Sequence, residues 1–187
     1  GLPLTLLLST LSIAMAFPLA LLVALGRRSN LPAIRTLCTI YVELIRGVPL
    51  ISVLFMASFM FPLFMPQGVK VDVLLRVLAG ITLFAAAYMA EVIRGGLQAI
   101  PKGQVEAAAS LGLSYWQTQR KIVLPQALRV IVPGLNSQYI SLAKNSSLAV
   151  ACGYSDLYSV AETTLNQSGR AVEVMLILLG AYLVLDL

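Results

Sequence analysis

The chain has 187 residues, of which 59% are apolar and only 11% are charged. A soluble domain is usually about a quarter charged, so this composition indicates a membrane protein. Histidine is absent, and Cys38 and Cys152 lie far apart, which removes the usual general base, a metal-binding spacing and a disulfide framework. We therefore expect no catalytic residue, no metal site and no cofactor bound by this chain.

Long uncharged runs predict the membrane spans, because a helix needs about 20 apolar residues to cross a bilayer. The predicted spans cover residues 4–25, 47–66, 73–92, 126–153 and 172–187. The first is too long for a signal peptide and lacks its basic start. The predicted fold class is an all-α membrane protein with about five transmembrane helices in one transmembrane domain, residues 1–187.

Two Glu–Arg pairs lie at the ends of predicted spans. Glu43 and Arg46 lie just before the second span, and Glu91 and Arg94 lie at the end of the third. Residues three apart in a helix share a face and can meet, and an unpaired charge is costly where it is partly buried. Two interpretations of these pairs stay open. The charges neutralise each other and anchor the helices, or the pairs form a gate that rearranges as it opens.

Glycine and proline predict irregularities along the spans. Gly47 and Pro49 predict a helix break where the second span begins, and Gly95 with Gly96 permits a bend after the third. The pair at 133–134, Pro-Gly, predicts a break inside the fourth span. Rigid-body movement of helices would need hinges at such places.

The element at residues 101–125 lies between the third and fourth spans and ends with EAAASLGLSYWQTQRKIVLP. Its alanine run predicts a short helix, and Gly112 suits the left-handed position that ends one. Ser114 and Gln117 are spaced as a capping box for a second helix, and Pro125 is expected to stop that helix. The sequence predicts a helical hairpin.

Basic residues fall mostly on one side of the predicted spans. Nine of the thirteen lie after the first or third span, and the positive-inside rule therefore places the hairpin in the cytoplasm and the N-terminus outside. The net charge of +5 is thus mainly a topological signal. We expect no nucleic-acid partner, because no basic face carries interleaved aromatic residues.

The hairpin resembles the EAA loop of the transmembrane subunits of ATP-binding-cassette importers. The defining residues are present without a gap, as Glu106, Ala107, Ala108, Gly112, Ile122, Leu124 and Pro125. Residues 41–50 (YVELIRGVPL) and 88–104 (YMAEVIRGGLQAIPKGQ) resemble permease subunits of polar amino-acid importers, and so do residues 124–126 and 144–148.

This resemblance implies the fold, the partners and the role of the chain. It implies a type I importer permease in the bacterial inner membrane, forming half of a homodimeric or heterodimeric pore. Its expected partners are ATPase subunits that bind ATP and Mg, a second permease subunit, a periplasmic amino-acid-binding protein and membrane lipid. The residues expected to couple to the ATPase are Glu106, Ala107, Ala108, Gly112 and Leu113.

The fourth span is the predicted place for a substrate, since polar groups at membrane depth are tolerated when they line a cavity. Expected substrate-binding residues are Leu50, Ser52, Asn145, Ser146 and Ser147. Permeases of this group more often have Lys-Asp-Thr-Ser-Leu at 144–148, and loss of that carboxylate weakens the case for cationic amino acids. Lys144 would attract a carboxylate or pair with an acid.

Three alternatives are left open by these residues. The same architecture would serve another small solute, such as an opine or a dipeptide. An ion-driven secondary transporter or channel would need an ionisable relay, for which Lys144 is the mid-span candidate. An intramembrane enzyme would need a polar site at membrane depth, for which Ser141 and Lys144 offer only helical spacing.

Overall fold

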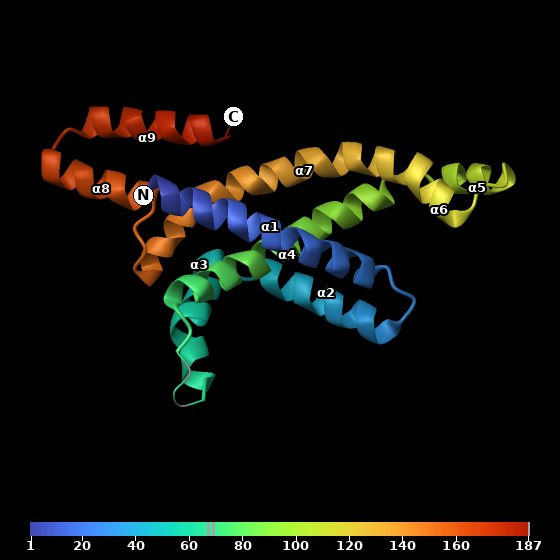
Figure 1. Ribbon diagram of the computed structural model, residues 1–187, viewed down its shortest axis with the longest axis horizontal. Helices are drawn as coiled ribbons and strands as arrows, with labels where there is room; N and C mark the ends of the chain where they lie inside the picture. The colour runs from blue at the N-terminus through green and yellow to red at the C-terminus, as the bar shows by residue number, and fades with distance from the viewer. Residues whose placement is uncertain (67, 69, 187) are drawn as a thin grey trace.

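The computed structural model describes residues 1–66, 68 and 70–186, and almost all of these form helices (Figure 1). The α-helices are α1 (Leu2–Arg27), α2 (Pro32–Arg46), α3 (Leu50–Phe55), α4 (Val73–Gln98), α5 (Lys102–Ser110), α6 (Tyr115–Thr118), α7 (Leu124–Asn145), α8 (Leu157–Ser168) and α9 (Ala171–Asp186). Short π or 3₁₀ segments are η1 (Met56–Met60), η2 (Phe61–Phe64), η3 (Gln119–Val123) and η4 (Ser146–Cys152).

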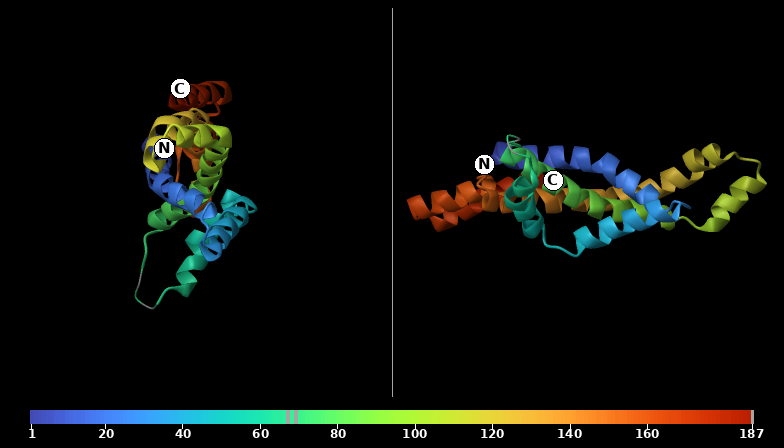
Figure 2. Two further views of the ribbon diagram at one scale, coloured as in Figure 1. Left: turned by 90° about the vertical axis from the view of Figure 1, so that its right-hand side faces the viewer. Right: turned by 90° about the horizontal axis from the view of Figure 1, so that it is seen from below.

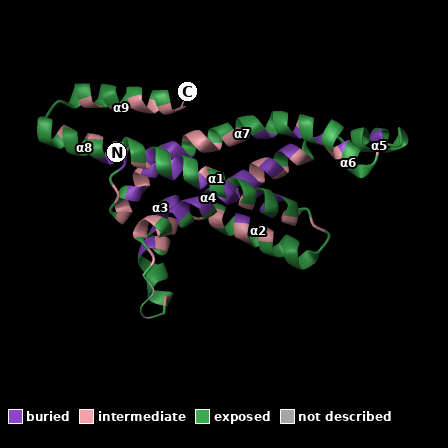
Figure 3. Ribbon diagram, in the orientation of Figure 1, coloured by how far each residue is buried: buried purple, intermediate pink, exposed green. Residues whose placement is uncertain are grey.

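A bundle of α1, α4 and α7 forms the long body of the molecule, and α2 packs along α1 and α4 (Figure 1). The buried face of α1 is a stripe of small and polar residues, which includes Ser9, Ser12, Ala16, Ala20 and Ala24. Small side chains let helix backbones approach closely, which is how helices associate where lipid gives no hydrophobic drive. Figure 3 shows the buried residues gathered where these helices cross.

The packing of α4 on α7 uses glycines that the sequence suggested for bends. A Cβ on Gly96 would lie 2.3 Å from the Ile131 side chain, and one on Gly134 would lie 2.5 Å from Val92. Helix α4 continues through Gly95 and Gly96 to Gln98, and α7 continues through Pro133 to Asn145. The predicted break at 133–134 is therefore wrong, because close helix packing, not a hinge, uses these positions.

The chain does break between α2 and α3, as Gly47 and Pro49 predicted. Helix α2 ends at Arg46, and the following helical segment Leu50–Phe64 is turned by 106° from it. That segment passes through the π turn η1, where the Arg76 guanidinium donates to the carbonyl of Ser58. A hydrogen bond from Arg76 of α4 thus satisfies the Ser58 carbonyl within this wider turn.

Two helices of the described residues, α1 and α4, are long and apolar enough to cross a membrane, and the bent pair of α2 and Leu50–Phe64 adds a third if it forms one span. The segment predicted as the fourth span is occupied by α7 and η4, and the fifth coincides with α9. Neither α7 nor α9 meets the same test, because α9 has 16 residues and α7 carries many polar side chains. The predicted span boundaries stay predictions.

Helix α8 is an element that the sequence analysis did not predict. Its start is capped by Asp156, whose Oδ1 accepts from the Ser159 amide at 3.0 Å, and it ends at Gly169 with φ of +67°. An Asp before the first turn and a Gly after the last are ordinary helix boundaries, so the signal was present. Helices α8 and α9 lie at the end of the bundle opposite to α5 and α6 (Figure 1).

Candidate functional site: the EAA element and the charged cluster

The EAA element (residues 101–125) extends beyond the ends of α1 and α2, as the view from below in Figure 2 shows. Its first helix, α5, ends in the turn that the glycine predicted. Gly112 has φ of +74°, its amide donates to Ala109 O at 2.9 Å, and the Leu113 amide donates to Ala108 O at 3.1 Å. These two bonds form a Schellman motif, which satisfies carbonyls at the helix end and reverses the chain.

The second helix of the element begins with the predicted capping box. Ser114 Oγ accepts from the Gln117 amide at 3.4 Å, and Gln117 Oε1 accepts from the Ser114 amide at 2.9 Å. The prediction that Pro125 stops this helix is wrong. The chain passes from α6 through the π turn η3 directly into α7, and Pro125 follows this turn without ending the helix.

The tip of the element carries large apolar side chains that nothing in the described chain covers. Leu111 is 81% exposed, Tyr115 69% and Trp116 79%. Of the residues predicted to couple, Ala108 is buried inside the hairpin and Leu113 is half-buried, while Glu106, Ala107 and Gly112 are exposed. The turn is therefore prebuilt, and apolar surface at its end is available to another protein.

A cavity of about 640 Å³ separates the element from the ends of the bundle helices. It is lined by Leu25 and Arg28 of α1, Leu97 of α4, and Glu106 and Tyr115 of the element, among others. The side chain of Gln126 donates to Gln104 Oε1 and ties α7 to α5. The element is therefore linked to α7 while a gap remains beside it.

The predicted charged residues meet in one cluster, defined here as Arg27, Glu43, Arg46, Glu91 and Arg94. Glu91 of α4 is its centre, because Arg27 Nη1 lies 2.5 Å from Glu91 Oε2, Arg46 Nη1 lies 3.9 Å from it, and Arg94 pairs with Oε1. The Glu91 side chain is 23% exposed. One carboxylate thus joins the ends of α1, α2 and α4.

The cluster differs from the two separate pairs that the spacing suggested. Glu91 and Arg94 do meet, but Glu43 pairs with Arg27 Nη2 at 3.3 Å and Arg46 turns to Glu91. The Arg46 guanidinium also lies 5.6 Å from the ring centre of Tyr88, within the range of a cation–π contact. Arg27 was missed because its partners are 16 and 64 residues away.

The predicted substrate-binding residues come from segments that pack together. Helix α3, which holds Leu50 and Ser52, contacts η4. The Cys152 thiol of η4 donates to the Leu54 carbonyl of α3 at 3.8 Å, and Ser58 Oγ of η1 lies 3.1 Å from Cys152 Sγ. Leu50 and Ser146 are buried, whereas Ser52, Asn145 and Ser147 are half-buried. The elements are thus adjacent, while the ligand contacts stay a prediction.

Two acids contact polar residues of the fourth predicted span, namely Ser146 and Lys144. Ser146 Oγ lies 3.4 Å from Oδ2 of the fully buried Asp156 and donates to Ala143 O at 2.8 Å. Lys144 pairs with Asp186 of α9 at 3.1 Å, which is the second of the two roles suggested for this lysine. Asp156 was not singled out from the sequence, because only the fold brings it to Ser146.

Known proteins match this chain over most of its length. The family described as "Binding-protein-dependent transport system inner membrane component" matches residues 16–187. The inner membrane amino-acid ABC transporter permease protein YhdY of Escherichia coli K12 is 55% identical over 85% of this chain and 43% of its own length. The probable glutamine ABC transporter permease protein GlnP of Bacillus subtilis 168 is 39% identical over 90% of this chain and 76% of its own length.

The BztC permease of Rhodobacter capsulatus, of a glutamate/glutamine/aspartate/asparagine transport system, is 48% identical over 83% of this chain. The chain spans 43% of YhdY and 36% of BztC, which is less than half of each.

Solved structures confirm the predicted all-helical permease fold. A crystal structure of an amino acid ABC transporter with histidines has a TM-score of 0.86 at 31% identity and covers 100% of this chain and 86% of the matched chain. An inward-facing structure of the MetNI methionine ABC transporter matches in fold, with a TM-score of 0.68 at 23% identity over 98% of this chain and 85% of that chain. The chain therefore belongs to the family of binding-protein-dependent transport system inner membrane components, and it has the fold of an ABC importer permease.

Proposed function

We propose that the chain is a transmembrane permease subunit of an ATP-driven importer for amino acids. It forms half of a translocation pathway, and a separate ATPase subunit supplies the energy. The observation that carries this proposal is the EAA element, a prebuilt hairpin with an exposed apolar tip beyond the ends of the spans. The names of the relatives support the amino-acid class of substrate.

The element is suited to transmit a movement of the ATPase to the membrane helices. Its tip offers Leu111, Tyr115 and Trp116 for insertion into a groove, as aromatic and aliphatic anchors commonly do at interfaces. Because α6 passes through η3 into α7 without a break, a pull on the tip acts directly on α7. The chain itself performs no bond chemistry in this proposal.

The proposed orientation places the EAA element in the cytoplasm and the N-terminus outside, in a bacterial inner membrane. The separation of the basic residues supports it. Single cysteines at Lys70 and Lys102, in a protein whose Cys38 and Cys152 are replaced by serine, are expected to react with impermeant reagents from opposite sides. Lys70 should react from outside, and reaction of both from one side would overturn the orientation.

Substrate is proposed to pass between this subunit and a second permease subunit after delivery by a periplasmic binding protein. The adjacency of α3 and η4 supports a site that includes Leu50, Ser52 and residues 145–147. The half-buried Asn145 and Ser147 offer both donors and acceptors to a zwitterion. We infer no charge selection among amino acids from these neutral side chains.

Co-purification with the ATPase tests the proposal. The full-length protein should be isolated with the ATPase whose gene neighbours its own, and should transport radiolabelled amino acids in proteoliposomes with the binding protein and ATP. Serine at Leu111 and Trp116 together should weaken ATPase binding by about thirtyfold or more, because truncating an interface anchor typically costs about 2 kcal/mol or more.

The matched control is Tyr158→Ser, which removes a 45% exposed aromatic from α8 at the opposite end. This variant should retain the ATPase. Equal binding by the wild type and the Leu111/Trp116 variant would contradict coupling through the tip. Uptake that proceeds without ATP but follows an ion gradient would instead favour a secondary transporter.

A further inference from the structure

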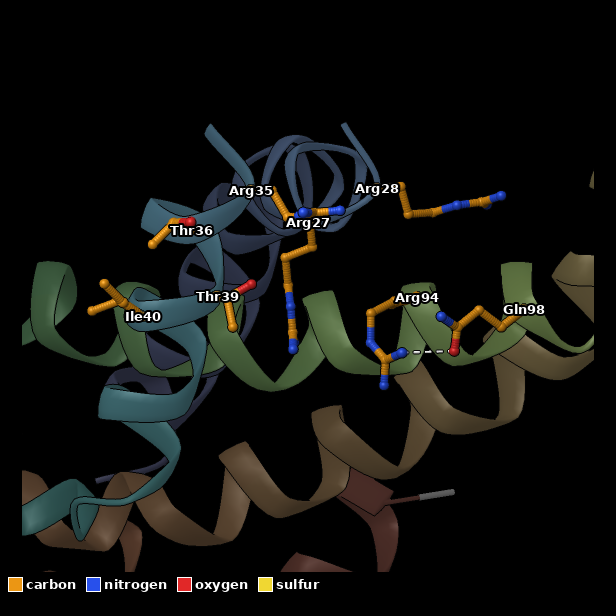
Figure 4. A pocket seen from close by; sticks show the side chains of 8 residues that line it. All are labelled: Arg27, Arg28, Arg35, Thr36, Thr39, Ile40, Arg94 and Gln98. Atoms are coloured by element: carbon orange, nitrogen blue, oxygen red, sulfur yellow. Dashed lines mark hydrogen bonds between the residues drawn. The ribbon is translucent and has the colours of Figure 1, made fainter. Parts of the chain in front are cut away.

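A basic pocket lies beside the charged cluster, at the ends of α1, α2 and α4. It has a volume of about 320 Å³, and four arginines line it, which are Arg27, Arg28, Arg35 and Arg94. Figure 4 shows Arg27 reaching between α2 and α4, with Arg94 turned to Gln98. No carboxylate lines this pocket among the described residues.

The positive charge of the pocket is only partly neutralised. Arg27 and Arg94 share Glu91 and Glu43 with the cluster. Arg28 and Arg35, which are exposed, form no ion pair with any carboxylate in the part of the chain that the structure describes. The pocket therefore keeps a surplus of positive charge that an anion would neutralise.

Neutral donors complete the lining. Thr36 and Thr39 are three apart on α2, so both side chains lie on the face that lines the pocket. Gln98 accepts from Arg94 through Oε1 at 2.6 Å, which leaves its NH₂ group to donate elsewhere. Guanidinium groups with hydroxyl and amide donors are the set that binds phosphate oxygens well.

The setting of the pocket favours a lipid as the source of that phosphate. The pocket lies at the ends of α1 and α4, the two helices most able to span a membrane. Its wall on α2 includes Ile40, which is 54% exposed and is followed on the same helical face by Leu44, 59% exposed. Exposed apolar residues beside a basic pocket suit the acyl chains of a lipid rather than a soluble ion.

An apolar groove continues from that face. It has a volume of about 610 Å³ and begins at Leu44, Ile45 and Val48, where α2 ends. Residues of η1, η2 and α4 form its other wall, and Arg76 is the one charged residue among its described lining. The basic pocket and the apolar groove therefore both include residues of α2, with arginines lining the one and apolar side chains lining the other.

We propose that the basic pocket binds the phosphate of an anionic phospholipid, whose acyl chain lies along Ile40 and Leu44 into the apolar groove. The site shares Arg28 with the cavity beside the EAA element but includes none of the predicted substrate residues, so it does not depend on which solute is transported. Basic pockets between membrane helices bind acidic headgroups by the same electrostatics. Bound lipid would also hold α2 against α4, next to Glu91.

Lipid retention by the purified transporter tests the proposal. The detergent-solubilised full complex should be incubated with phosphatidylglycerol, with phosphatidylcholine or with inorganic phosphate, and bound lipid counted by native mass spectrometry. The wild type should retain phosphatidylglycerol in preference to phosphatidylcholine. Changing Arg28 and Arg35 together to Gln should weaken that binding by roughly thirtyfold, since each basic residue near an anionic lipid contributes about 1 kcal/mol, or about fivefold.

Matched variants separate a built site from general charge attraction. Arg170→Gln makes the same change at an exposed position between α8 and α9 and should leave retention unchanged. Thr36→Val with Thr39→Val keeps the charge and should still weaken retention about fivefold or more through lost hydrogen bonds. Monodisperse elution and unchanged helical circular dichroism are required of each variant.

Three results would overturn the proposal. The first is equal retention of phosphatidylglycerol by the wild type and the double arginine variant. The second is an equal loss in Arg170→Gln, which would indicate nonspecific attraction. The third is competition by inorganic phosphate at millimolar concentration, which would indicate a site for a soluble anion and no use of the apolar groove.

Discussion

The EAA element and the charged cluster lie at the same end of the bundle but are built in different ways. The turn of the element is formed by bonds between residues close in sequence, such as Leu113 to Ala108 and Ser114 to Gln117. The cluster is formed by side chains from three helices, with Arg27 and Glu91 separated by 64 residues. Local chemistry therefore fixes the element, while helix packing fixes the cluster.

This difference determines how each region should respond to substitution. A change in the element alters its own shape and leaves the bundle intact, because few of its side chains are buried in the core. A change in the cluster leaves local helix structure intact and weakens the joining of α1, α2 and α4. Changes in the element should therefore reduce mainly transport, whereas changes in the cluster should reduce mainly stability.

The largest expected effect is that of Gly112→Val. The left-handed backbone at this position, with φ of +74°, is strongly disfavoured for a β-branched residue. No atom outside the neighbouring residues would contact an added Cβ within 4 Å, so the backbone angle and not a clash causes the effect. Transport in proteoliposomes should fall to background while the isolated ATPase still hydrolyses ATP.

Gly95→Val is the control for this variant, because a Cβ there also meets no atom within 4 Å and its φ is not positive. It should retain most of the transport activity. Normal transport by Gly112→Val would mean that the turn is not needed for coupling to the ATPase. The view that local turn geometry determines how the element works would then be wrong.

Asn145→Ala tests a residue that lies in neither region, at the junction of α7 and η4. If Asn145 hydrogen-bonds the substrate, its loss should raise the substrate concentration needed for half-maximal transport by about ten- to a hundredfold, since a buried hydrogen bond of this kind contributes roughly 1–3 kcal/mol. Asn166→Ala, an exposed position on α8, should have no effect. A loss of heat stability with normal transport would instead assign Asn145 to helix packing.

Glu91→Gln should destabilise the bundle without disturbing the element. Removing its charge leaves three arginines without their shared partner at a site where the side chain is 23% exposed. The expected loss is about 1–3 kcal/mol of unfolding free energy, measured as a lower thermal midpoint in detergent. Transport per folded molecule should change little if the cluster anchors the helices, and should change strongly if it is a gate.

Glu43→Gln is the matched control, because this side chain is 61% exposed and forms one pair at 3.3 Å. Exposed pairs contribute little, so its thermal midpoint should stay close to that of the wild type. Equal shifts in the two variants would show that Glu91 is not the centre of the cluster.

The sequence was most informative for turns and helix starts that depend on a few neighbouring residues. Gly112, Ser114 and Gln117 took their predicted places because turn and capping geometry depends on neighbours within a few residues. The break at Gly47 and Pro49 was predicted for the same reason. Hydropathy similarly indicated α1 and α4, which are long and apolar enough to cross a membrane.

The sequence was less informative where helix packing decides which of several possible contacts a residue makes. Gly96 and Gly134 permitted a bend in principle, but contacts with Ile131 and Val92 use them for close approach. The choice of Arg27 rather than Arg46 as the partner of Glu43 likewise depends on how α1 lies against α2. Such contacts need the three-dimensional arrangement, which residue spacing does not specify.

The smallest expected effect is that of Ser114→Ala, which removes the hydroxyl from the capping box and keeps the glycine turn. Loss of an N-cap typically costs about 1 kcal/mol. The distance of 3.4 Å between Ser114 Oγ and the Gln117 amide nitrogen makes this hydrogen bond a weak one among N-caps. Transport should therefore fall less than about fivefold, and Ser114→Asp should restore it by accepting the same bond. Ser110→Ala removes a hydroxyl that bonds the Glu106 carbonyl within α5 and should be neutral. If Ser114→Ala were as damaging as Gly112→Val, the second helix rather than the turn would set the shape of the element, because only α6 depends on the cap.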